Sequence, residues 1–403
     1  MKIGVVVDNE LNKDKRVLRE LQILKESGYE IFVLCFGCGK IFSDPLPGIT
    51  IERIDLNKKF NDILFLFLNT IPVYEWLWSS RINKFISRYG IEFLHVHDLY
   101  MAKAAYSGIK KANKDLPLIL DLHENYSFAV TTYNWTKGFL RSLISRPQDW
   151  EKKEKEYLGF ADRIIVLSND FRDLLISRYP ELSIDSFTTL PNVPDLSQRE
   201  IKGNVSVKDL FNNDFPVLFY YGVIAERRGV FDALNVFTEL LKENFPINFL
   251  LIGPVDKKDK NRFFELINLE LLADRVHYIP WIESNGLAAY LEISDICIAP
   301  FHKNPQHESG VANKIYDYML GAKPIIASDC LPQQKLIEKH NCGLVFRNME
   351  ELHNSIIRLA GDNELRRSMG KNGYEAIIKE YNINSVRENL LRIYDYYGAQ
   401  HLR

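Results

Sequence analysis

The sequence predicts an α/β fold with two doubly wound parallel-sheet domains. The chain has 403 residues, and one hydrophobic core stops growing below that size, so two domains of about 200 residues each are expected. Short apolar runs alternate with amphipathic stretches, which is typical of parallel strands covered by helices. This alternation stops at a proline-containing segment and then starts again. The pattern therefore occurs twice.

In the first half, strands are expected at 3–7, 30–35, 93–96, 117–121 and 163–167. Five apolar residues after the first strand recur at helical spacing and predict a helix that ends near Gly28. They are Val17, Leu18, Leu21, Ile23 and Leu24.

The second half repeats the pattern from about Phe215. Strands are expected at 216–221, 247–252, 275–279, 295–299, 323–327 and 342–345, each followed by a helical stretch. Pro191 and Pro194 separate the two series, and the polar stretch 197–213 is interpreted as a linker or surface loop. The domain boundary is accordingly placed at 195/196, with the second domain running to 380. The tail 381–403 is a further helix with no strand left to cover.

Composition excludes several classes of protein. The formal net charge is −2, whereas nucleic-acid binders need surplus Lys and Arg, so no nucleic-acid partner is expected. The opening Met1–Asp8 stretch predicts a strand rather than a signal peptide, and a cytoplasmic location follows. Cys35 and Cys38 form a C-x-x-C pair without a second pair at similar spacing, so no zinc site is expected there.

The most apolar stretch of the chain is 63–78, which is interrupted by Asn69, Pro72 and Glu75. It is too short to span a bilayer of about 30 Å. Two interpretations remain open. The stretch is a buried helix, or it is an interfacial or lipid-acceptor surface with Trp76 and Trp78 at the level of the headgroups.

The stretch 307–324 follows a predicted strand and opens a helix at its carboxyl end. Ser309 and Gly310 suit the turn into this helix, whose free N–H groups predict an anion site for a diphosphate. Asp317 lies eight residues after Ser309, which is about 12 Å of helix rise. Its carboxylate is expected to accept both hydroxyls of a ribose. The alternative is that Asp317 is a solvated residue on the outer face of the helix.

Other candidate residues follow predicted strands in the same way. Arg227 and Arg228 come after the first strand of the second domain, where a cation can neutralise charge on a leaving phosphate, although loop arginines are often only solvated. His123 follows a strand of the first domain and can donate to a sugar or remain structural. His95 and His97 share one face of a strand and suggest a metal pair, but no third ligand is evident.

Taken in order, these motifs resemble the retaining glycosyltransferases of family 4. The likeness covers nearly the whole chain. Its elements are 14–20, His95-Val96-His97-Asp98, Asp121-Leu122-His123-Glu124, 161–168, Leu190-Pro191-Asn192-Val193, 222–229 and 313–324. The resemblance implies the GT-B fold, with two Rossmann-like domains facing across a cleft, and a final helix that returns from about residue 381 to the first domain.

The resemblance also implies roles for single residues. In this family the cation before the Gly of the second domain's first loop binds the diphosphate, which matches Arg228. A histidine at a first-domain strand end contacts the donor sugar, which matches His123. The second acid of an E-x7-E motif holds the ribose, which matches Asp317.

Three departures from the family pattern change the expected site. The first acid of the motif is replaced by Ser309, with Glu308 adjacent, and Glu308 is assigned its function, with a solvated loop carboxylate as the alternative. Val223 stands where a basic residue often follows Gly222, so the pyrophosphate is expected to rely more on Arg228 and Lys314.

The third departure is at the amino terminus. The sequence Asp8-Asn9-Glu10 replaces a Gly-Gly turn that many relatives carry, and this leaves the acceptor subsite open. The catalytic candidates are His123, Arg228 and Glu308. The donor-binding candidates are Gly222, Arg227, Ser309, Gly310, Val311, Asn313, Lys314 and Asp317, and the acceptor-side candidates are Asp8, Asn9, Arg16, His97 and Asp98.

The expected activity is transfer of a sugar, with retention, from a UDP- or GDP-sugar to a glycan or a lipid-linked acceptor of a cell-surface polysaccharide pathway. No Asp-x-Asp metal motif ends a strand, so no metal cofactor is expected to be required. The location is cytoplasmic, with contact to the inner membrane through 63–78. A nucleotide-sugar epimerase of the same fold and a non-catalytic sugar-nucleotide or glycan-binding subunit are the alternatives. A dinucleotide oxidoreductase is disfavoured because no G-x-G-x-x-G follows a strand.

Overall fold

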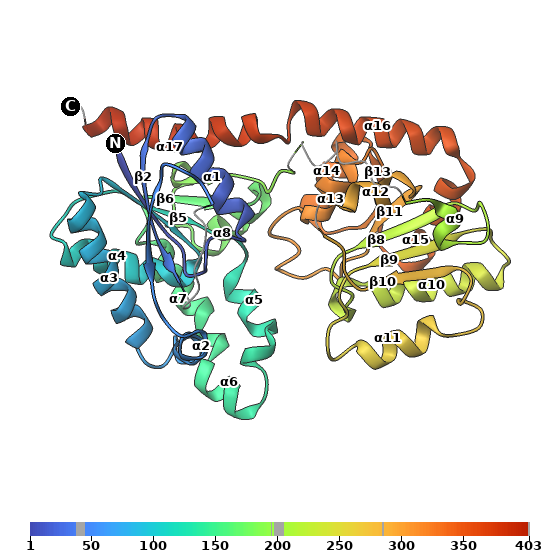
Figure 1. Ribbon diagram of the computed structural model, residues 1–403, viewed down its shortest axis with the longest axis horizontal. Coiled ribbons are helices and arrows are strands. Elements are labelled where there is room, and N and C mark those ends of the chain that lie inside the picture. Colours follow the sequence, from blue (N-terminus) through green and yellow to red (C-terminus); the bar gives the residue numbers. More distant parts are fainter. Residues whose placement is uncertain (38–44, 195, 197–204, 284–285, 402–403) are drawn as a thin grey trace. The chain divides into compact units, whose positions relative to one another are not determined.

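The chain forms two compact units in the computed structural model, which describes residues 1–403 except 38–44, 195, 197–204, 284–285 and 402–403 (Figure 1). The first unit is Met1–Pro191 together with Val386–Arg403, and the second is Asn192–Ser385. The division thus falls a few residues before the boundary expected at 195/196. The final helix joins the first unit from Val386 rather than from 381.

The first unit contains a parallel sheet in the order β3-β2-β1-β4-β5-β6-β7. Its strands are β1 (Lys2–Val6), β2 (Glu30–Phe36), β3 (Thr50–Ile54), β4 (Phe93–His97), β5 (Leu118–Asp121), β6 (Arg163–Val166) and β7 (Phe187–Thr189). Its helices are α1 (Lys15–Glu26), α2 (Lys58–Leu66), α3 (Val73–Tyr89), α4 (Ala102–Lys111), α5 (Tyr126–Thr132), α6 (Phe139–Ser145), α7 (Trp150–Leu158), α8 (Asn169–Arg178) and most of α17 (Ile383–His401).

The second unit contains a parallel sheet in the order β10-β9-β8-β11-β12-β13. Its strands are β8 (Val217–Tyr221), β9 (Asn248–Ile252), β10 (Val276–Ile279), β11 (Ile296–Ala299), β12 (Ile325–Ser328) and β13 (Gly343–Phe346). Its helices are α9 (Val207–Leu210), α10 (Val230–Lys242), α11 (Lys260–Ile267), α12 (Leu287–Glu292), α13 (Asn313–Leu320), α14 (Leu331–His340), α15 (Met349–Gly361) and α16 (Asn363–Lys379).

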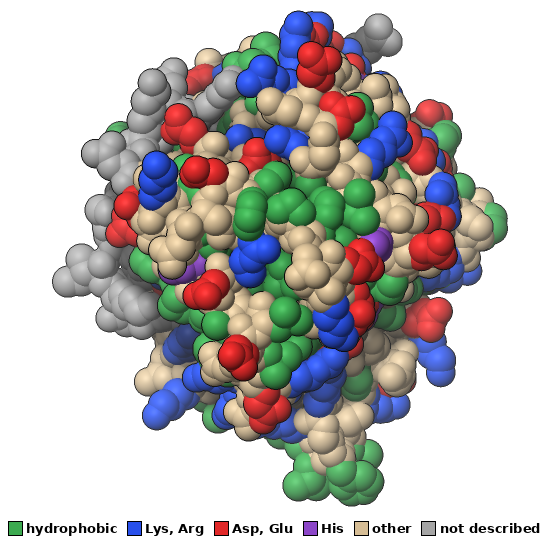
Figure 2. Space-filling view, turned by 90° about the vertical axis from the view of Figure 1, so that its right-hand side faces the viewer, with side chains coloured by type: hydrophobic (Ala, Val, Ile, Leu, Met, Phe, Trp, Pro, Cys, Tyr) green, Lys and Arg blue, Asp and Glu red, His purple; other side chains and the backbone are tan. Residues whose placement is uncertain are grey.

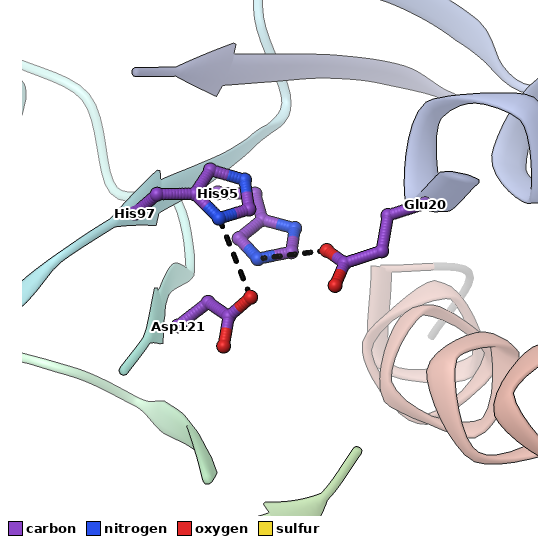
Figure 3. A group of neighbouring side chains, drawn as sticks. All are labelled: Glu20, His95, His97 and Asp121. Carbon is purple, nitrogen blue, oxygen red and sulfur yellow. Dashed lines mark ion pairs between the residues drawn. The ribbon is translucent and has the colours of Figure 1, made fainter. Parts of the chain in front are cut away.

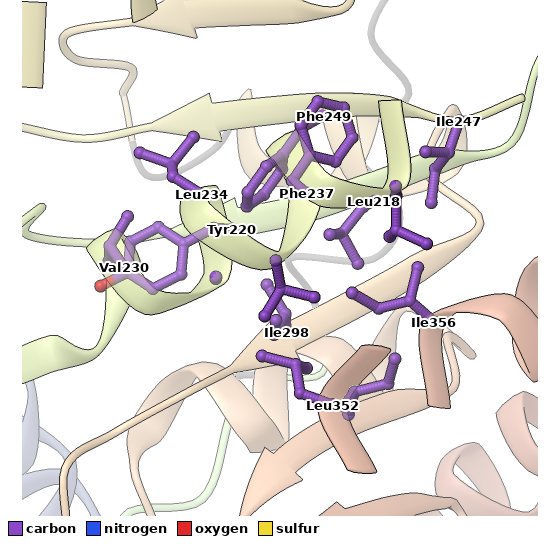
Figure 4. Close-up of a cluster of buried hydrophobic side chains, with 14 of the residues drawn as sticks. Leu218, Tyr220, Val230, Leu234, Phe237, Ile247, Phe249, Ile298, Leu352 and Ile356 are labelled. Atoms are coloured by element: carbon purple, nitrogen blue, oxygen red, sulfur yellow. The ribbon is translucent and has the colours of Figure 1, made fainter. Parts of the chain in front are cut away.

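The sheet of the second unit is buried on both faces. Leu218 and Tyr220 of β8 point into one hydrophobic cluster, part of which is drawn in Figure 4, whereas Val217 and Phe219 point into another. Successive residues of a strand face opposite sides, so two separate cores on one strand require helices on both sides of the sheet. The predicted doubly wound α/β architecture is confirmed.

The expected strands are all present, within one or two residues at each end. The structure adds β3 and β7, which the sequence pattern did not predict. These two strands are the outer ones of the first sheet. Outer strands are paired on one side only, so they are short or carry polar residues, as Glu52 and Arg53 of β3 show. The stretch 197–213 lies partly outside the described residues, and its described part includes the short helix α9.

The apolar stretch 63–78 is not one helix. It contains the end of α2, a turn at 67–72 and the start of α3. Trp78 is fully buried in the first core, whereas Trp76 is exposed. Two residues of a helix that are two positions apart point in nearly opposite directions, because each residue turns the helix by about 100 degrees. The expectation that both tryptophans lie at a surface is therefore wrong for Trp78. Within the described part of the chain, no helix combines the length and the apolar character needed to cross a membrane.

Candidate functional sites at the strand ends

Both sheets reverse their strand order at a point next to their first strand. In the second unit this point lies between β8 and β11, and in the first unit between β1 and β4. Loops diverge to opposite faces of the sheet there, and open parallel sheets bind ligands in the resulting crevice at the carboxyl ends of the strands. The candidate residues of each unit gather at these two positions.

In the second unit, the loop after β8 presents Arg228. A single 3-10 turn, Glu226–Arg228, leads into Gly229, whose φ is +69°. A Cβ at Gly229 would lie 1.5 Å from the carbonyl oxygen of Pro300, which follows β11. Only glycine fits this contact, so the close packing of the two loops fixes the place of the preceding arginine. The Arg228 guanidinium lies 5.3 Å from the centre of the Phe301 ring.

Lys314, on the first turn of α13, comes to the same place. Its Nζ lies 3.6 Å from the centre of the Tyr220 ring and 5.1 Å from that of Phe301. It also lies 3.1 Å from the point where a Cβ of Gly222 would be. A side chain at Gly222 would therefore press on the ammonium group. The glycine keeps the strand end open beside the cation.

This pair of cations has few partners within its own unit. Among the described residues, the Lys314 Nζ and the Arg228 Nε are buried atoms that contact no hydrogen-bond partner. Burial and the neighbouring Arg228 hold the pKa of Lys314 well below its usual range. Two cations that share a buried position repel each other, and a bound anion would satisfy both. The arrangement is that of an anion site at the switch point of the sheet.

The turn before α13 differs from the prediction. The helix begins at Asn313 with Ala312 as its N-cap, so Ser309 and Gly310 do not open it. Ser309 is buried and its hydroxyl donates to the carbonyl of Gln306, 2.7 Å away. The estimate of 12 Å of helix rise from Ser309 to Asp317 is wrong for the same reason, because the four residues before Asn313 are not helical.

Glu308 has a structural contact that the sequence did not reveal. Its Oε1 accepts a hydrogen bond of 3.0 Å from the backbone N–H of Leu331, the first residue of α14. A carboxylate in this position satisfies a free N–H group and the positive end of the helix dipole. Glu308 thus ties its loop to α14.

The other donor-side candidates of the second unit lie around the cation pair. Asp317, one turn after Lys314, is half-buried. The pKa of Tyr221, at the end of β8, is raised mainly by burial and further by the charge of Asp317. Val311 is half-buried and Asn313 is exposed. Arg227 is exposed and forms an ion pair of 3.8 Å with Asp256.

In the first unit, Asp121 is the centre of a buried network at the end of β5. Arg16 of α1 donates two hydrogen bonds of 2.8 Å to its two carboxylate oxygens. The Nδ1 of His97 lies 3.3 Å from Asp121 Oδ2, and the Nε2 of His123 lies 3.4 Å from the same oxygen. Burial works against ionisation, but Arg16 and the two histidines hold the pKa of Asp121 well below its usual range. Arg16 was expected to contact the acceptor, but its guanidinium is paired with Asp121 inside the unit.

His123 stands between two carboxylates. Its Nδ1 lies 4.0 Å from Asp98 Oδ1, on the side away from Asp121. Burial opposes the charged form, but Asp98 and Asp121 outweigh it and raise the pKa of His123 to about 9. Burial likewise raises the pKa of Asp98 to about 7, against the opposing effect of His123. The imidazole is therefore a charged donor at neutral pH.

Asp8, directly beyond β1, extends this network. It accepts hydrogen bonds of 2.7 Å from the Tyr74 hydroxyl and 2.8 Å from the Tyr100 hydroxyl. Tyr100 also lies 3.2 Å from Asp98. Asn9 does not join the network, because its side chain bonds to Asp14 at the start of α1. The structure thus brings five of the six first-unit candidates together and leaves Asn9 aside.

A group of four side chains of the types that bind metals shares His97 and Asp121 with this network. Glu20, His95, His97 and Asp121 each offer one ligand atom within 4.8 Å of the others (Figure 3). Glu20 and Asp121 supply the further ligands that the sequence did not show for the His95–His97 pair. Arg16 already lies 3.3 Å from Glu20 and 2.8 Å from Asp121. A divalent cation would stand beside this buried guanidinium, so the charges favour an ion-pair network over a metal centre.

Sequence reasoning missed the aromatic and acidic residues that support these sites. Tyr220 and Phe301 place the two cations, Tyr100 links two carboxylates, and Glu20 is a buried acid whose pKa is raised by burial to about 8. For Glu20 a signal existed, because it stands on the same apolar helical face as Leu21 and Leu24. For the aromatic residues the sequence contained none, since each is also an ordinary core residue.

Two family models of glycosyltransferases together match most of the chain. The model of the family described as "Glycosyltransferase Family 4" matches residues 15–198, and that of "Glycosyl transferases group 1" matches residues 202–376. A curated relative, the alpha-D-kanosaminyltransferase of Streptomyces kanamyceticus, is 23% identical over 334 residues, which cover 79% of this chain and 81% of the relative.

Two solved structures illustrate the fold. The sucrose-phosphate synthase of Thermosynechococcus elongatus aligns with a TM-score of 0.74 at 17% identity, covering 99% of this chain and 100% of that one. The Anabaena protein HepE, in complex with UDP-glucose, aligns with a TM-score of 0.69 at 13% identity, covering 98% and 100%. The two matched families join at the boundary between the two sheets, and the chain belongs to the glycosyltransferases of family 4, with the GT-B fold.

Proposed function

We propose that this glycosyltransferase takes its sugar from a nucleoside diphosphate sugar and transfers it with retention of the anomeric configuration. The observation that carries the proposal is the pair formed by the buried Lys314 and the half-buried Arg228 at the switch point of the second sheet. A diphosphate is the group in such a donor that these two cations would hold. Solved structures of HepE are described as complexes with UDP, with UDP and glucose, and with UDP-glucose, which supports a UDP-sugar donor, with a GDP-sugar as the second choice.

The cation pair also suits the chemistry. Breaking the anomeric bond leaves negative charge on the departing phosphate, and fixed cations stabilise that charge more in the transition state than in the substrate. Gly222 leaves room at the strand end. Asp317 lies one turn along α13, where its carboxylate accepts hydrogen bonds from the ribose hydroxyls of the donor nucleotide. Because Arg228 and Lys314 supply the positive charge, we propose that no metal ion is required.

The remaining roles belong to side chains around the two switch points. We assign His123 to the donor sugar as a charged hydrogen-bond donor, with Asp8, His97 and Asp98 on the acceptor side. The acceptor is a glycan or a lipid-linked glycan of a cell-surface polysaccharide or lipopolysaccharide pathway. The enzyme would then act in the cytoplasm at the inner face of a membrane, with 63–76 in contact with it.

A donor screen tests this proposal. Thermal unfolding of the purified chain is followed with UDP, GDP and other nucleoside diphosphates, and the true donor nucleotide should raise the midpoint by mass action. Arg228→Ala should abolish that shift and lower turnover about 10² to 10³-fold, the usual cost of removing one such donor. Arg227→Ala is the matched control, because its side chain is exposed and paired with Asp256. Equal effects of the two changes would contradict the proposal.

Assays with and without acceptor distinguish the alternatives. A transferase consumes the donor only when a glycan or lipid acceptor is present. An epimerase would release a changed free sugar or sugar nucleotide without an acceptor, and a binding subunit would show the thermal shift but no turnover.

A further inference from the structure

The outer face of α6 exposes three large hydrophobic side chains that the described fold does not cover. On this short helix Phe139, Leu140 and Leu143 are exposed to 85%, 69% and 65%. Single apolar residues at a surface are ordinary, but adjacent large ones mark an interaction site. The fold of the first unit does not require them, because α6 contributes only Ser145 to its buried residues. Their exposure therefore needs another explanation.

The same end of the first unit carries the exposed face of α2, the turn that follows it and the start of α3. Phe60, Ile63, Ile71, Val73 and Trp76 are all exposed there. Together with α6 these segments, 58–76 and 137–146, are named the apolar end. In Figure 1, α2 and α6 lie together at the lower end of the first unit, and Figure 2 shows hydrophobic side chains projecting at the bottom of the view.

Specific contacts fix α2 on the first unit and join the two segments of the apolar end. The Phe65 ring, on the inner face of α2, lies 5.0 Å from the Trp135 ring and 5.2 Å from the Tyr100 ring. The side-chain amide of Asn69 donates a hydrogen bond of 2.6 Å to the carbonyl of Arg146. The inner face is thus anchored in the core, and the outer face is presented as one surface.

The charges around this surface are mostly positive. Five basic residues stand in the two segments, and Lys137 and Arg141 flank Phe139 and Leu140 directly. The basic residues are Lys58, Lys59, Lys137, Arg141 and Arg146, and the acidic ones are Asp62 and Glu75. Apolar side chains bordered by lysine and arginine are the composition of segments that rest in the headgroup region of anionic bilayers.

We propose that the apolar end docks the first unit onto an anionic lipid bilayer, with Phe139, Leu140 and Leu143 inserted below the headgroups. This inference rests on the proposed function, because a lipid-linked acceptor would lie in such a membrane. It also extends that function, since α6 is the main anchor and 63–76 the supporting contact. A bilayer fits better than a protein groove because the apolar side chains project outward and are bordered by basic residues.

Vesicle flotation tests the proposal with the full chain. Vesicles of phosphatidylcholine with one third phosphatidylglycerol should carry the protein upward, and vesicles of phosphatidylcholine alone should carry much less. The triple variant Phe139→Ser, Leu140→Ser, Leu143→Ser should bind the anionic vesicles at least tenfold more weakly. Trp281→Ser is the matched control, because Trp281 is 68% exposed on the second unit and should not matter.

Charge and insertion can be tested separately. Arg141→Glu should weaken binding and reduce its dependence on salt, because one attractive contact to the headgroups becomes repulsive. Phe139→Trp should keep binding and show additional fluorescence quenching with brominated lipids, relative to the wild type. Quenching equal to that of the wild type would place Phe139 outside the bilayer and overturn the proposal.

The remaining outcomes are equally decisive. Wild-type protein that fails to float with anionic vesicles, or a triple variant that floats as well as the wild type, overturns the proposal. A triple variant that changes a dimer to a monomer in light scattering, without any change in flotation, would assign the surface to a second copy of this chain. The nucleotide-induced thermal shift is measured without lipid, so failure of the proposed function and failure of docking are separate results.

Discussion

At the scale of single residues, the two switch points use charge in opposite ways. Around Asp121 the first unit pairs most buried charges internally, with Arg16, His97 and His123 as partners, although the adjoining Glu20 Oε2, His95 Nε2 and His97 Nε2 contact no hydrogen-bond partner among the described residues. Around Lys314 the second unit leaves the Lys314 Nζ and the Arg228 Nε without a hydrogen-bond partner among its described residues. A balanced network is stable without a ligand, whereas desolvated cations cost free energy until an anion binds. Under the proposed function, the second unit would receive the phosphate of the donor nucleotide at these cations.

Lys314→Met is expected to have opposite effects on stability and on binding. The change removes a desolvated cation but keeps most of the side-chain volume, so the free energy of unfolding without ligand should stay equal or rise. Affinity for the donor nucleotide should fall tenfold or more, because a hydrogen bond to a charged group is worth about 1.5–3 kcal/mol. Calorimetric titration and urea unfolding measure the two quantities.

The control for this experiment is Lys323→Met. The Nζ of Lys323 donates to the carbonyl of Glu292, and the residue lies before β12, away from the carboxyl ends of the strands. Nucleotide affinity should be unchanged in this variant. A loss of stability in Lys314→Met with unchanged affinity would show that Lys314 is a core residue only.

His123 should make the stability of the first unit depend on pH. Its pKa is raised to about 9 in the folded chain, against ~6.5 for an unfolded histidine. The folded state therefore binds the proton more tightly, and this contribution is complete below pH ~6.5 and lost as the pH rises towards 9. The difference in unfolding free energy between wild type and His123→Ala should shrink across this range, by on the order of 2 kcal/mol.

The cause of that shift can be checked with Asp98→Asn. Without this carboxylate the pKa of His123 should be lower, so the loss of stability should begin at a lower pH. NMR titration of the His123 ring gives the same information directly. Identical titration curves in the wild type and in Asp98→Asn would assign the raised pKa to Asp121 alone.

At the scale of elements, the loop between β8 and α10 decides where the Arg228 guanidinium lies. Gly229 combines a φ of +69° with a contact that leaves no space for a Cβ. Pro300 and Phe301 follow β11, the neighbouring strand of the sheet. One loop therefore packs on the other, and the position of Arg228 depends on this packing rather than on the arginine alone.

Gly229→Ala should lower both stability and nucleotide affinity. The new methyl group meets the Pro300 carbonyl and an unfavourable backbone conformation, so the cost should exceed ~1 kcal/mol. Gly361→Ala is the control, because a Cβ there meets nothing within 4 Å at the end of α15. It should be neutral or slightly stabilising. Thermal unfolding with and without nucleotide measures both effects, and a Gly229→Ala chain with normal affinity would show that the loop does not position Arg228.

At the scale of the whole molecule, most of the last helix belongs to the unit that contains the amino-terminal residues. Leu390, Ile393 and Tyr394 of α17 are buried in the first unit. The Tyr394 hydroxyl lies 2.8 Å from the Nδ1 of His95 at the buried network. The first unit is therefore completed only after the second has been synthesised.

Tyr394→Phe should destabilise the first unit without affecting the second. The change leaves the buried Nδ1 of His95 without its partner, which costs about 1–3 kcal/mol. Urea unfolding should show an earlier loss of the first unit, while the nucleotide-induced thermal shift of the second unit persists. Tyr396→Phe is a suitable control, because Tyr396 is exposed on the same helix. Equal stability of the two variants would contradict this role of α17.

The sequence by itself determined the alternation of strands and helices, the break near Pro191 and the ordered motifs of family 4. These features follow from local periodicity and spacing, which sequence preserves. The outer strands β3 and β7 escaped prediction, because their stability comes from pairing with β2 and β6 rather than from a pattern of their own.

Only the tertiary structure decided which side chains meet. Arg16 and Asp121 are 105 positions apart and form one buried pair, and Lys314 reaches Tyr220 across the switch point. The direction of Trp78 and the late start of α13 were also settled by packing. Contacts between distant segments depend on how whole elements pack, and no local pattern encodes them.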